Sequence, residues 1–221
     1  MLKVFIAPTD IADISEEMML SEYRKNKITA LKSVEAKKQS RAAGMLLAYA
    51  LNACFGIDES GLEYGVTAQG KPYLVHYADI HFNISHTSGW CAVALSDKPV
   101  GIDIERIKNF FDGHSRVAVA KRYFTAQEIV AYGLNLSGAG KLGTRCFYRL
   151  WTAKESAVKC SGEGIAEGFK TFSLPFFTDR CEYKERYFTA FDTDEYAMSL
   201  CSRSDEVASI EIVSFFEDIK I

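Results

Sequence analysis

A short apolar segment that carries two carboxylates constrains this chain more than any other feature. The segment is Val100–Glu105, and Asp103 and Glu105 are its charged residues. Residues two apart in a β-strand point to the same face. The two carboxylates are therefore expected to project side by side, where a divalent cation would remove their repulsion.

A second segment, Trp151–Lys159, follows about fifty residues later and has a helix-forming composition. Trp151, Glu155 and Lys159 are four residues apart, so a helix places them on one stripe. The stripe offers a third carboxylate and an ammonium group. Three carboxylates with a lysine suit a Mg²⁺ ion that holds a polyphosphate.

Each of these patterns alone has an ordinary explanation. Alternating polar residues in a strand commonly mark a solvated face. Glu155 and Lys159 could be a surface pair on a helix, and a tryptophan such as Trp151 is usually part of a core. The two segments in this order are what favours a metal and phosphate site.

Two further segments accompany them, Phe82–Thr87 (Phe-Asn-Ile-Ser-His-Thr) and Gly70–Tyr73 (Gly-Lys-Pro-Tyr). In order and spacing, the four segments resemble the signature of the 4'-phosphopantetheinyl transferase superfamily, G-x-D with W-x-x-K-E-x-x-x-K. The resemblance covers roughly residues 1 to 165. The length resembles the surfactin-synthetase-activating type, in which one chain builds one site.

The resemblance implies an α+β fold of two similar halves about a pseudo-twofold axis, with the site between them. The polar turn Ser96–Pro99 is the expected boundary, which divides the chain into residues 1–97 and 98–221. The sequence pattern agrees, because each half has a long helical segment followed by strands. The helices are expected at Ser33–Ala53, with Gly56 as its terminator, and at Thr144–Cys160.

The remaining elements are predicted from apolar alternation and turn residues. Helices are expected at Val117–Arg122 and Gln127–Tyr132, and a loop at Gly133–Gly143. Strands are expected at the following ranges: Lys3–Ala7, Leu62–Val66, Tyr73–Val75, His81–Ile84, Trp90–Leu95, Pro99–Glu105, Lys170–Leu174, Tyr187–Phe191, Tyr196–Cys201 and Ala208–Phe216.

Members of the family transfer the phosphopantetheine arm of coenzyme A to a serine of an apo acyl or peptidyl carrier protein. The reaction depends on Mg²⁺ and releases 3',5'-ADP. The resemblance implies Asp103, Glu105 and Glu155 as the metal ligands, and Lys159 at the pyrophosphate or the attacking serine. It implies that coenzyme A is held by Arg41, Lys71, Ser85, His86 and Lys159.

The proton acceptor is left open between two residues. Glu155 is favoured, and Glu128 is the second candidate because Phe124–Glu128 resembles the family's F-[ST]-x-x-E element. An alternative for Glu128 is a helix-capping box with Thr125. His86 could likewise be structural, and Lys25 and Lys27 cannot be aligned with the phosphate-binding lysines of the family.

Composition limits the partners. The net charge of −3 argues against general nucleic-acid binding, and no apolar run approaches the length of a membrane span. The six cysteines have no metal-ligand spacing, and a reducing cytoplasm accounts for them most simply. We expect a cytoplasmic monomer.

Two other functions remain compatible with the sequence. One is a Mg²⁺-dependent phosphohydrolase that uses the same carboxylates with water as the nucleophile. The other is a non-catalytic protein of the same fold that binds pantetheine or a carrier protein.

Overall fold

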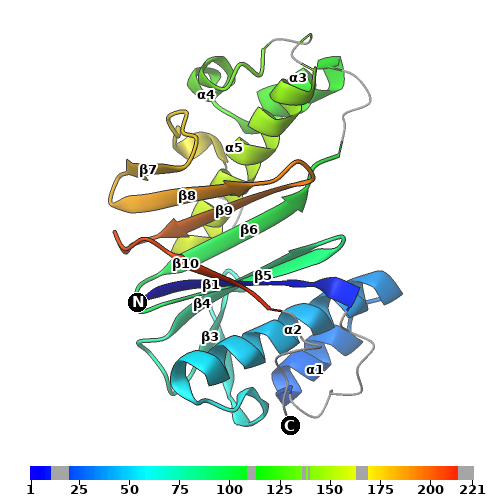
Figure 1. Ribbon diagram of the computed structural model, residues 1–221, viewed down its shortest axis with the longest axis vertical. Helices are drawn as coiled ribbons and strands as arrows, with labels where there is room; N and C mark the ends of the chain where they lie inside the picture. Colours follow the sequence, from blue (N-terminus) through cyan, green and yellow to red (C-terminus); the bar gives the residue numbers. More distant parts are fainter. Residues whose placement is uncertain (11–19, 109–112, 136–137, 139, 163–168, 214–221) are drawn as a thin grey trace.

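The computed structural model describes residues 1–10, 20–108, 113–135, 138, 140–162 and 169–213. Two four-stranded sheets stack between two long helices, so the layers run helix, sheet, sheet, helix (Figure 1). This confirms the predicted α+β class. A pseudo-twofold axis that relates the two halves stays a prediction.

The first sheet has the strand order β10-β1-β5-β4. Its strands are β1 (Leu2–Pro8), β4 (His81–Thr87), β5 (Trp90–Ser96) and β10 (Ser209–Ile212). Helix α2 (Val34–Phe55) covers one face through an apolar stripe that includes Leu46, Leu47 and Leu51. Ser33 caps its N-terminus, and it ends at the predicted terminator Gly56, whose φ of 67° is a left-handed conformation that favours glycine.

The second sheet has the order β6-β9-β8-β7. Its strands are β6 (Val100–Arg106), β7 (Arg180–Tyr183), β8 (Arg186–Asp192) and β9 (Tyr196–Ser202). Helix α5 (Gly140–Ser161) covers its outer face, while α3 (Gly113–Tyr123) and α4 (Ala126–Ala131) lie beyond α5 (Figure 1). Apolar side chains of both sheets, among them Val4 and Ile102, form the layer between them.

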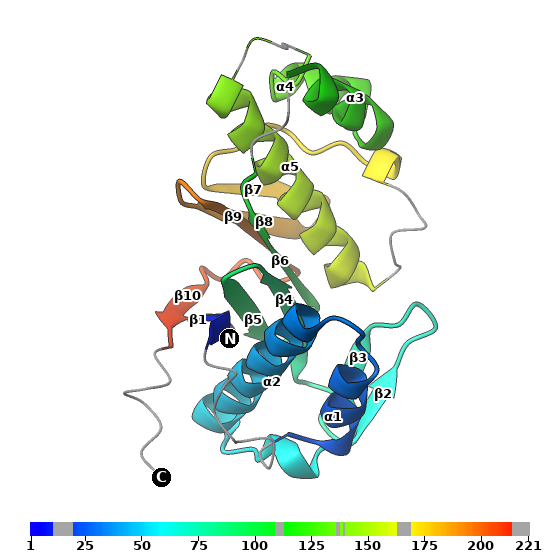
Figure 2. The same ribbon diagram turned by 90° about the vertical axis from the view of Figure 1, so that its right-hand side faces the viewer.

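Smaller elements complete the first half. They are helix α1 (Glu22–Thr29), a 3₁₀ turn η3 (Glu59–Gly61), and a hairpin of β2 (Tyr64–Val66) and β3 (Pro72–Leu74). The sequence analysis did not predict α1. The C-terminal end of α5 points toward the β2–β3 hairpin (Figure 2).

Two predictions differ from the structure after residue 168. Lys170–Leu174 is not a strand; a 3₁₀ turn η6 (Phe169–Thr171) and irregular chain occupy the region. The last predicted strand is present as β10, but it pairs in parallel with β1 and so returns to the first sheet. Residues 98–221 therefore do not form one sheet with their own helix, and residues 214–221 of the predicted strand lie outside the described residues.

Gly101 explains how α5 comes close to β6. A Cβ atom at this position would lie 2.1 Å from the carbonyl oxygen of Ser156 and 2.4 Å from the amide nitrogen of Cys160. No side chain fits there, so glycine permits the helix backbone to pack directly on the strand. The close approach places Lys159 over Asp103, two residues further along β6.

The described residues include no helix that combines the length and apolarity needed to cross a lipid bilayer. All six cysteines are free thiols, and Cys91, Cys160 and Cys201 are buried.

Candidate active site

Side chains of β4 join the two sheets at the position where the site forms. Alternate residues of β4 accept hydrogen bonds from alternate backbone amides of β6. The pairs are Asn83 with Ile102, Ser85 with Ile104 and Thr87 with Arg106, at 2.9, 3.2 and 3.2 Å. This side-chain ladder fixes the register of β4 against β6 and carries Ser85 to Asp103.

Asp103, Ser85 and Lys159 form one hydrogen-bonded cluster. The Lys159 ammonium lies 2.5 Å from Asp103 Oδ1 and donates to Ser85 Oγ at 3.1 Å. Ser85 in turn donates to the same Asp103 oxygen at 2.9 Å. The structure therefore brings together residues from β4, β6 and α5 that the sequence separates by as many as 74 positions.

The second oxygen of Asp103 has no hydrogen-bond partner in the part of the chain that the structure describes. Asp103 is 4% exposed, and its Oδ2 is buried without a hydrogen bond to any described residue. A buried carboxylate oxygen in that state costs about 1–3 kcal/mol, and more when it is charged. The cluster is thus incomplete in a way that a cation would correct.

Glu105 and Glu155 complete a group of three carboxylates whose charges act on one another. Burial raises the pKa of Glu105 to about 7, and the neighbouring charges of Asp103 and Glu155 add to that effect. Burial, followed by the charge of Asp103, also raises the pKa of Glu155. The three carboxylates are therefore close enough for their charges to interact, and their role as metal ligands stays a prediction.

The residues present fit a Mg²⁺ ion chemically, although they do not form a closed cage. Within the described ranges, no three His, Cys, Asp or Glu side chains are already close enough to hold a metal ion. The donor set is nevertheless all carboxylate, which Mg²⁺ prefers, and it includes the unpartnered Oδ2 of Asp103. Mg²⁺ characteristically takes only a few carboxylates and completes its shell with water and phosphate.

A basic pocket lies beside this cluster, on the other side of β4. Its volume is about 120 Å³, and Arg24, Lys27 and His86 are among the residues that line it. Arg24 is 5% exposed, and its Nε and Nη2 have no hydrogen-bond partner among the described residues. Burial, opposed mainly by Tyr64 and Glu59, lowers the pKa of this guanidinium. An unpartnered buried guanidinium is a binding position for an anion.

His86 connects the two regions. Its Nδ1 lies 3.3 Å from Gln39 Oε1 of α2. Partial desolvation lowers its pKa, and the positive charges of Lys159, Arg24 and Lys27 lower it further. The imidazole therefore sits in a positive field that an anion would relieve.

From the sequence, the basic residues of positions 24 to 41, among them Arg24 and Lys27, were interpreted as a solvated helix face in preference to an anion site. Arg24 lies in α1, which has little amphipathic character, so no pattern identified it as buried. Lys25, the neighbouring candidate, instead forms a surface pair with Glu22 at 3.0 Å. Arg41 lies on α2, one residue after Ser40, which lines the basic pocket.

Lys71 belongs neither to the cluster of Asp103, Ser85 and Lys159 nor to the residues that line the basic pocket. Its ammonium donates to the carbonyl oxygens of Val100 and Cys160, each at 3.1 Å, and so ties the Gly-Lys-Pro turn to the end of α5. Burial lowers its pKa. It also lines a separate pocket of about 260 Å³ with His81 and Ser161.

Glu128 is fully buried with other partners. One oxygen accepts from Lys154 at 2.7 Å and from the amide of Leu174 at 2.8 Å, and the other accepts from the amide and hydroxyl of Thr125. The predicted capping box with Thr125 is present. With every oxygen partnered and no exposed surface, Glu128 has no open position for a substrate proton.

Trp151 packs within an aromatic group of α5 and its neighbours rather than at the carboxylates. Its ring lies edge-on to Tyr123 and Phe169, with ring centroids 5.3 and 5.2 Å apart, and it stacks near Phe147. The tryptophan thereby anchors the helix that carries Glu155 and Lys159.

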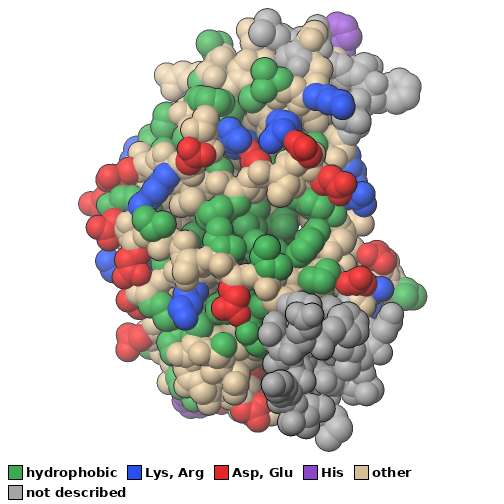
Figure 3. Space-filling view, viewed as in Figure 1, with side chains coloured by type: hydrophobic (Ala, Val, Ile, Leu, Met, Phe, Trp, Pro, Cys, Tyr) green, Lys and Arg blue, Asp and Glu red, His purple; other side chains and the backbone are tan. Residues whose placement is uncertain are grey.

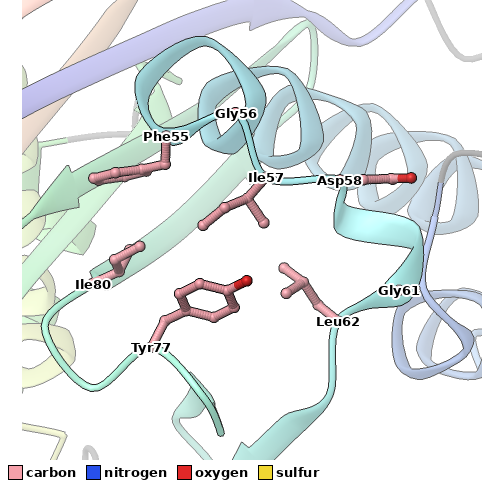
Figure 4. A pocket seen from close by; sticks show the side chains of 8 residues that line it. All are labelled: Phe55, Gly56, Ile57, Asp58, Gly61, Leu62, Tyr77 and Ile80. Carbon is pink, nitrogen blue, oxygen red and sulfur yellow. The ribbon is translucent and has the colours of Figure 1, made fainter.

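A hollow at the end of α2 does not share these features. Its volume is about 590 Å³, and Ile57, Leu62, Tyr77 and Ile80 converge in it (Figure 4). Its charged residue, Asp58, is an acid whose Oδ1 accepts two hydrogen bonds from Ser60. It offers no cation to a phosphate.

Comparison with known proteins gives a consistent result. The profile of the 4'-phosphopantetheinyl transferase superfamily matches residues 99–206, and the profile described as 4'-phosphopantetheinyl transferase, N-terminal, matches residues 12–98. A 4'-phosphopantetheinyl transferase of Bacillus subtilis is 32% identical over 182 residues, 78% of each chain. The 4'-phosphopantetheinyl transferase Sfp of Bacillus subtilis strain 168 is 30% identical, over 74% of this chain and 73% of its own length. The 4'-phosphopantetheinyl transferase HetI of Nostoc is 29% identical, over 60% of this chain and 55% of its own length.

Proposed function

Because the chain belongs to the 4'-phosphopantetheinyl transferase superfamily and is a transferase, we propose that it moves the phosphopantetheine arm of coenzyme A to a serine of an apo carrier protein. The observation that supports this best is the incomplete cluster of Asp103, Ser85 and Lys159, in which a buried carboxylate oxygen has no hydrogen-bond partner within the described ranges. The cluster adjoins a basic pocket suited to the other end of the coenzyme.

Asp103, Glu105 and Glu155 would hold Mg²⁺, which when bound supplies positive charge beside the pyrophosphate of the coenzyme. Lys159 already donates to Asp103 and Ser85, so its ammonium lies at the same position. An ammonium there can neutralise charge that develops on the phosphoryl oxygens.

The basic pocket would bind the phosphorylated ribose end of the coenzyme. Arg24 offers two N–H groups, Nε and Nη2, that have no hydrogen-bond partner among the described residues. Lys27 adds positive charge, and the imidazole of His86 adds a further donor. Arg41 stays a predicted contact from α2. Contact of Lys71 and Ser85 with the coenzyme also stays a prediction. The ammonium of Lys71 donates hydrogen bonds to two backbone carbonyl oxygens.

In the reaction, the serine oxygen of the carrier forms a bond to the phosphorus that bears the pantetheine arm. The bond from that phosphorus to the bridging pyrophosphate oxygen breaks, and 3',5'-ADP leaves. We assign the serine proton to the carboxylate of Glu155, directly or through a water molecule, since this carboxylate lies on the same helix face as Lys159. Glu128 is the weaker candidate because all its oxygens are hydrogen-bonded and buried.

One chain supplies one site in this proposal. Ser85 and Arg24 come from the first half, and Asp103 and Lys159 from the second. We therefore expect a monomer that binds one coenzyme A. An equilibrium titration with parallel sedimentation measures both, and one coenzyme per two chains with a matching dimer would contradict it.

The deciding experiment is incubation of the protein with coenzyme A, Mg²⁺ and a panel of apo carrier proteins, followed by intact mass measurement. We expect a carrier to gain the mass of the phosphopantetheine arm, and we expect no gain when its acceptor serine is replaced by alanine. Free phosphopantetheine formed without a carrier would indicate a phosphohydrolase. Coenzyme binding without either product would indicate a non-catalytic binding protein.

A further inference from the structure

Two hollows of the molecule differ in what their side chains indicate about a ligand. Apolar side chains surround the hollow in the middle of the face drawn in Figure 3, and such a lining does not specify an occupant. The basic pocket instead contains the guanidinium of Arg24, a buried cation on a polar helix. A buried cation of this kind must be held in place by its surroundings.

Arg24 occupies a position in α1 that often belongs to an acid. Ser21 caps the helix, and its Oγ accepts from the backbone amide of Arg24 at 3.4 Å. In a capping box, the residue at this third helical position is Glu or Gln, and its side chain accepts from the backbone amide of the cap. Arginine has no acceptor, so another residue has to satisfy the amide of Ser21.

Glu59 supplies that carboxylate from η3, 38 positions away in the sequence. Its Oε2 accepts from the amide of Ser21 at 2.7 Å, and its Oε1 accepts from the hydroxyls of Ser21 and Tyr64 at 2.8 and 2.7 Å. The hydroxyl hydrogen of Ser21 therefore points to Glu59, which leaves a lone pair of Ser21 Oγ for the amide of Arg24. Glu59 is buried, and its carboxylate fixes the start of α1.

The same carboxylate offsets the charge of Arg24 while leaving donors of the guanidinium open. Burial lowers the pKa of Arg24, and Tyr64 and Glu59 oppose that effect. Nε and Nη2 of Arg24 nevertheless have no hydrogen-bond partner among the described residues. A direct arginine–carboxylate pair would use such N–H groups, so the arrangement keeps them for an anion.

We propose that Glu59 is a positioning residue for the coenzyme: it replaces the capping-box glutamate of α1 and so leaves the third helical position to an arginine that binds the remote phosphate. Glu59 is not among the described residues that line the basic pocket, so it acts through Arg24. The role rests on the proposed function, in which this pocket takes the phosphorylated ribose end of coenzyme A.

The test measures the dissociation constants of coenzyme A and dephospho-coenzyme A by titration calorimetry on the full chain, without a carrier protein. Glu59→Gln keeps the size of the side chain but sets an NH₂ group against donors of Ser21 or Tyr64. We expect the Kd for coenzyme A to rise about fivefold, and the Kd for dephospho-coenzyme A to rise less than about twofold. Asp58→Asn is the matched control, because this neighbouring acid accepts from Ser60 and should not affect either constant.

A double variant tests whether Glu59 acts through Arg24. Residues that act through one another show non-additive effects. The variant with both Arg24→Met and Glu59→Gln should therefore bind coenzyme A about as weakly as Arg24→Met alone. Additive losses would overturn the proposal, and so would equal weakening of the two coenzymes by Glu59→Gln or tighter binding of coenzyme A.

Tyr64→Phe makes a smaller change in the same network, in case Glu59→Gln does not fold. It removes one donor to Glu59 and keeps the ring that stacks on Tyr23, and we expect the Kd for coenzyme A alone to rise about threefold. An unchanged ratio of the two dissociation constants in both variants, with normal binding by the native chain, would overturn the role of Glu59 alone. A native chain that does not bind coenzyme A would overturn the proposed function and this role with it.

Discussion

Helix α5 carries two lysines, Lys154 and Lys159, that each pair with a carboxylate, and the surroundings of the two pairs differ. The pair of Lys154 with Glu128 has no exposed surface on either side chain. The pair of Lys159 with Asp103 is 29% and 6% exposed. The same two chemical groups on the same helix therefore occupy two different environments.

Hydrogen bonding separates the pairs further. Lys154 donates to Glu128 and to the carbonyl oxygen of Phe172, and its ammonium lies 3.9 Å from the centre of the Phe172 ring. Glu128 has partners on both oxygens. Among the described residues, Asp103 in contrast has two partners for one oxygen and none for the other.

The comparison distinguishes a pair that completes a fold from a pair that awaits a ligand. A buried ion pair is tolerated when every donor and acceptor is satisfied, and its loss is costly because one charge is left behind. An incomplete pair at a partly open position keeps binding capacity for a cation or a phosphate. The same substitution should therefore mainly lower stability at Lys154 and mainly lower activity at Lys159.

The largest expected effect is on stability. Lys154→Met removes the ammonium and leaves Glu128 charged in a buried position, so we expect the free energy of unfolding to fall by about 3–5 kcal/mol. Lys159→Met alters a partly exposed pair, and we expect a loss of about 1 kcal/mol or less. Urea denaturation of both variants measures the difference.

A double variant checks the cause. Replacing Glu128 with leucine in the Lys154→Met background removes the stranded carboxylate, and it should recover part of the lost stability. If Lys154→Met and Lys159→Met lost equal stability, or if the double variant recovered nothing, the two pairs would not differ as described.

The second effect is on transfer. Lys159→Met should lower the rate of pantetheine transfer by about 10²–10³-fold, the range found when a group that stabilises developing charge is removed. Lys154→Met, measured on its folded fraction, should retain most of the activity because its ammonium does not reach the cluster. Rates from intact mass spectra under saturating coenzyme A provide the measurement. A normal rate for Lys159→Met would exclude Lys159 from the reaction.

The sequence predicted the local spacings in the two lysine pairs much better than it predicted the pairing of residues far apart in the chain. Periodicity alone placed Asp103, Glu155 and Lys159 on a strand face and a helix stripe, because these spacings are local. The capping box of Glu128 was also predicted, since its members are three residues apart. The partnership of Glu128 with Lys154, which joins positions 26 residues apart, was not.

Non-local packing explains the other differences between prediction and structure. The strand β10 was predicted, but only the folded chain determines that it pairs with β1. Arg24 was assigned to a solvated helix face because the burial of a charged side chain in a polar helix has no signal in composition. The glycine of the G-x-D motif was recognised by resemblance, whereas its physical reason, the approach of α5, appears only in the structure.

The third effect concerns the basic pocket. Arg24→Met removes a buried guanidinium whose Nε and Nη2 are unpartnered, and it should raise the KM for coenzyme A by about tenfold or more, since a hydrogen bond to a charged group contributes about 1.5–3 kcal/mol. The KM for dephospho-coenzyme A should rise less, because that substrate lacks the remote phosphate. Lys25→Met is the matched control, as Lys25 pairs with Glu22 on the surface of the same helix. An equal increase for both substrates would place Arg24 elsewhere.

The smallest expected effect is on stability in the presence of metal. If Mg²⁺ binds the folded chain at Asp103, the free energy of unfolding should increase by about 1.4 kcal/mol at a Mg²⁺ concentration ten times its Kd. Asp103→Asn should lose this increase, while Glu128→Gln, although less stable, should keep it because Glu128 lies in the completed pair. Sodium chloride at matched ionic strength separates binding from screening of surface charge. Equal stabilisation of the native chain and Asp103→Asn by Mg²⁺ would mean that the unpartnered oxygen of Asp103 is not where the ion binds, and the contrast between the two lysine pairs would then rest on burial alone.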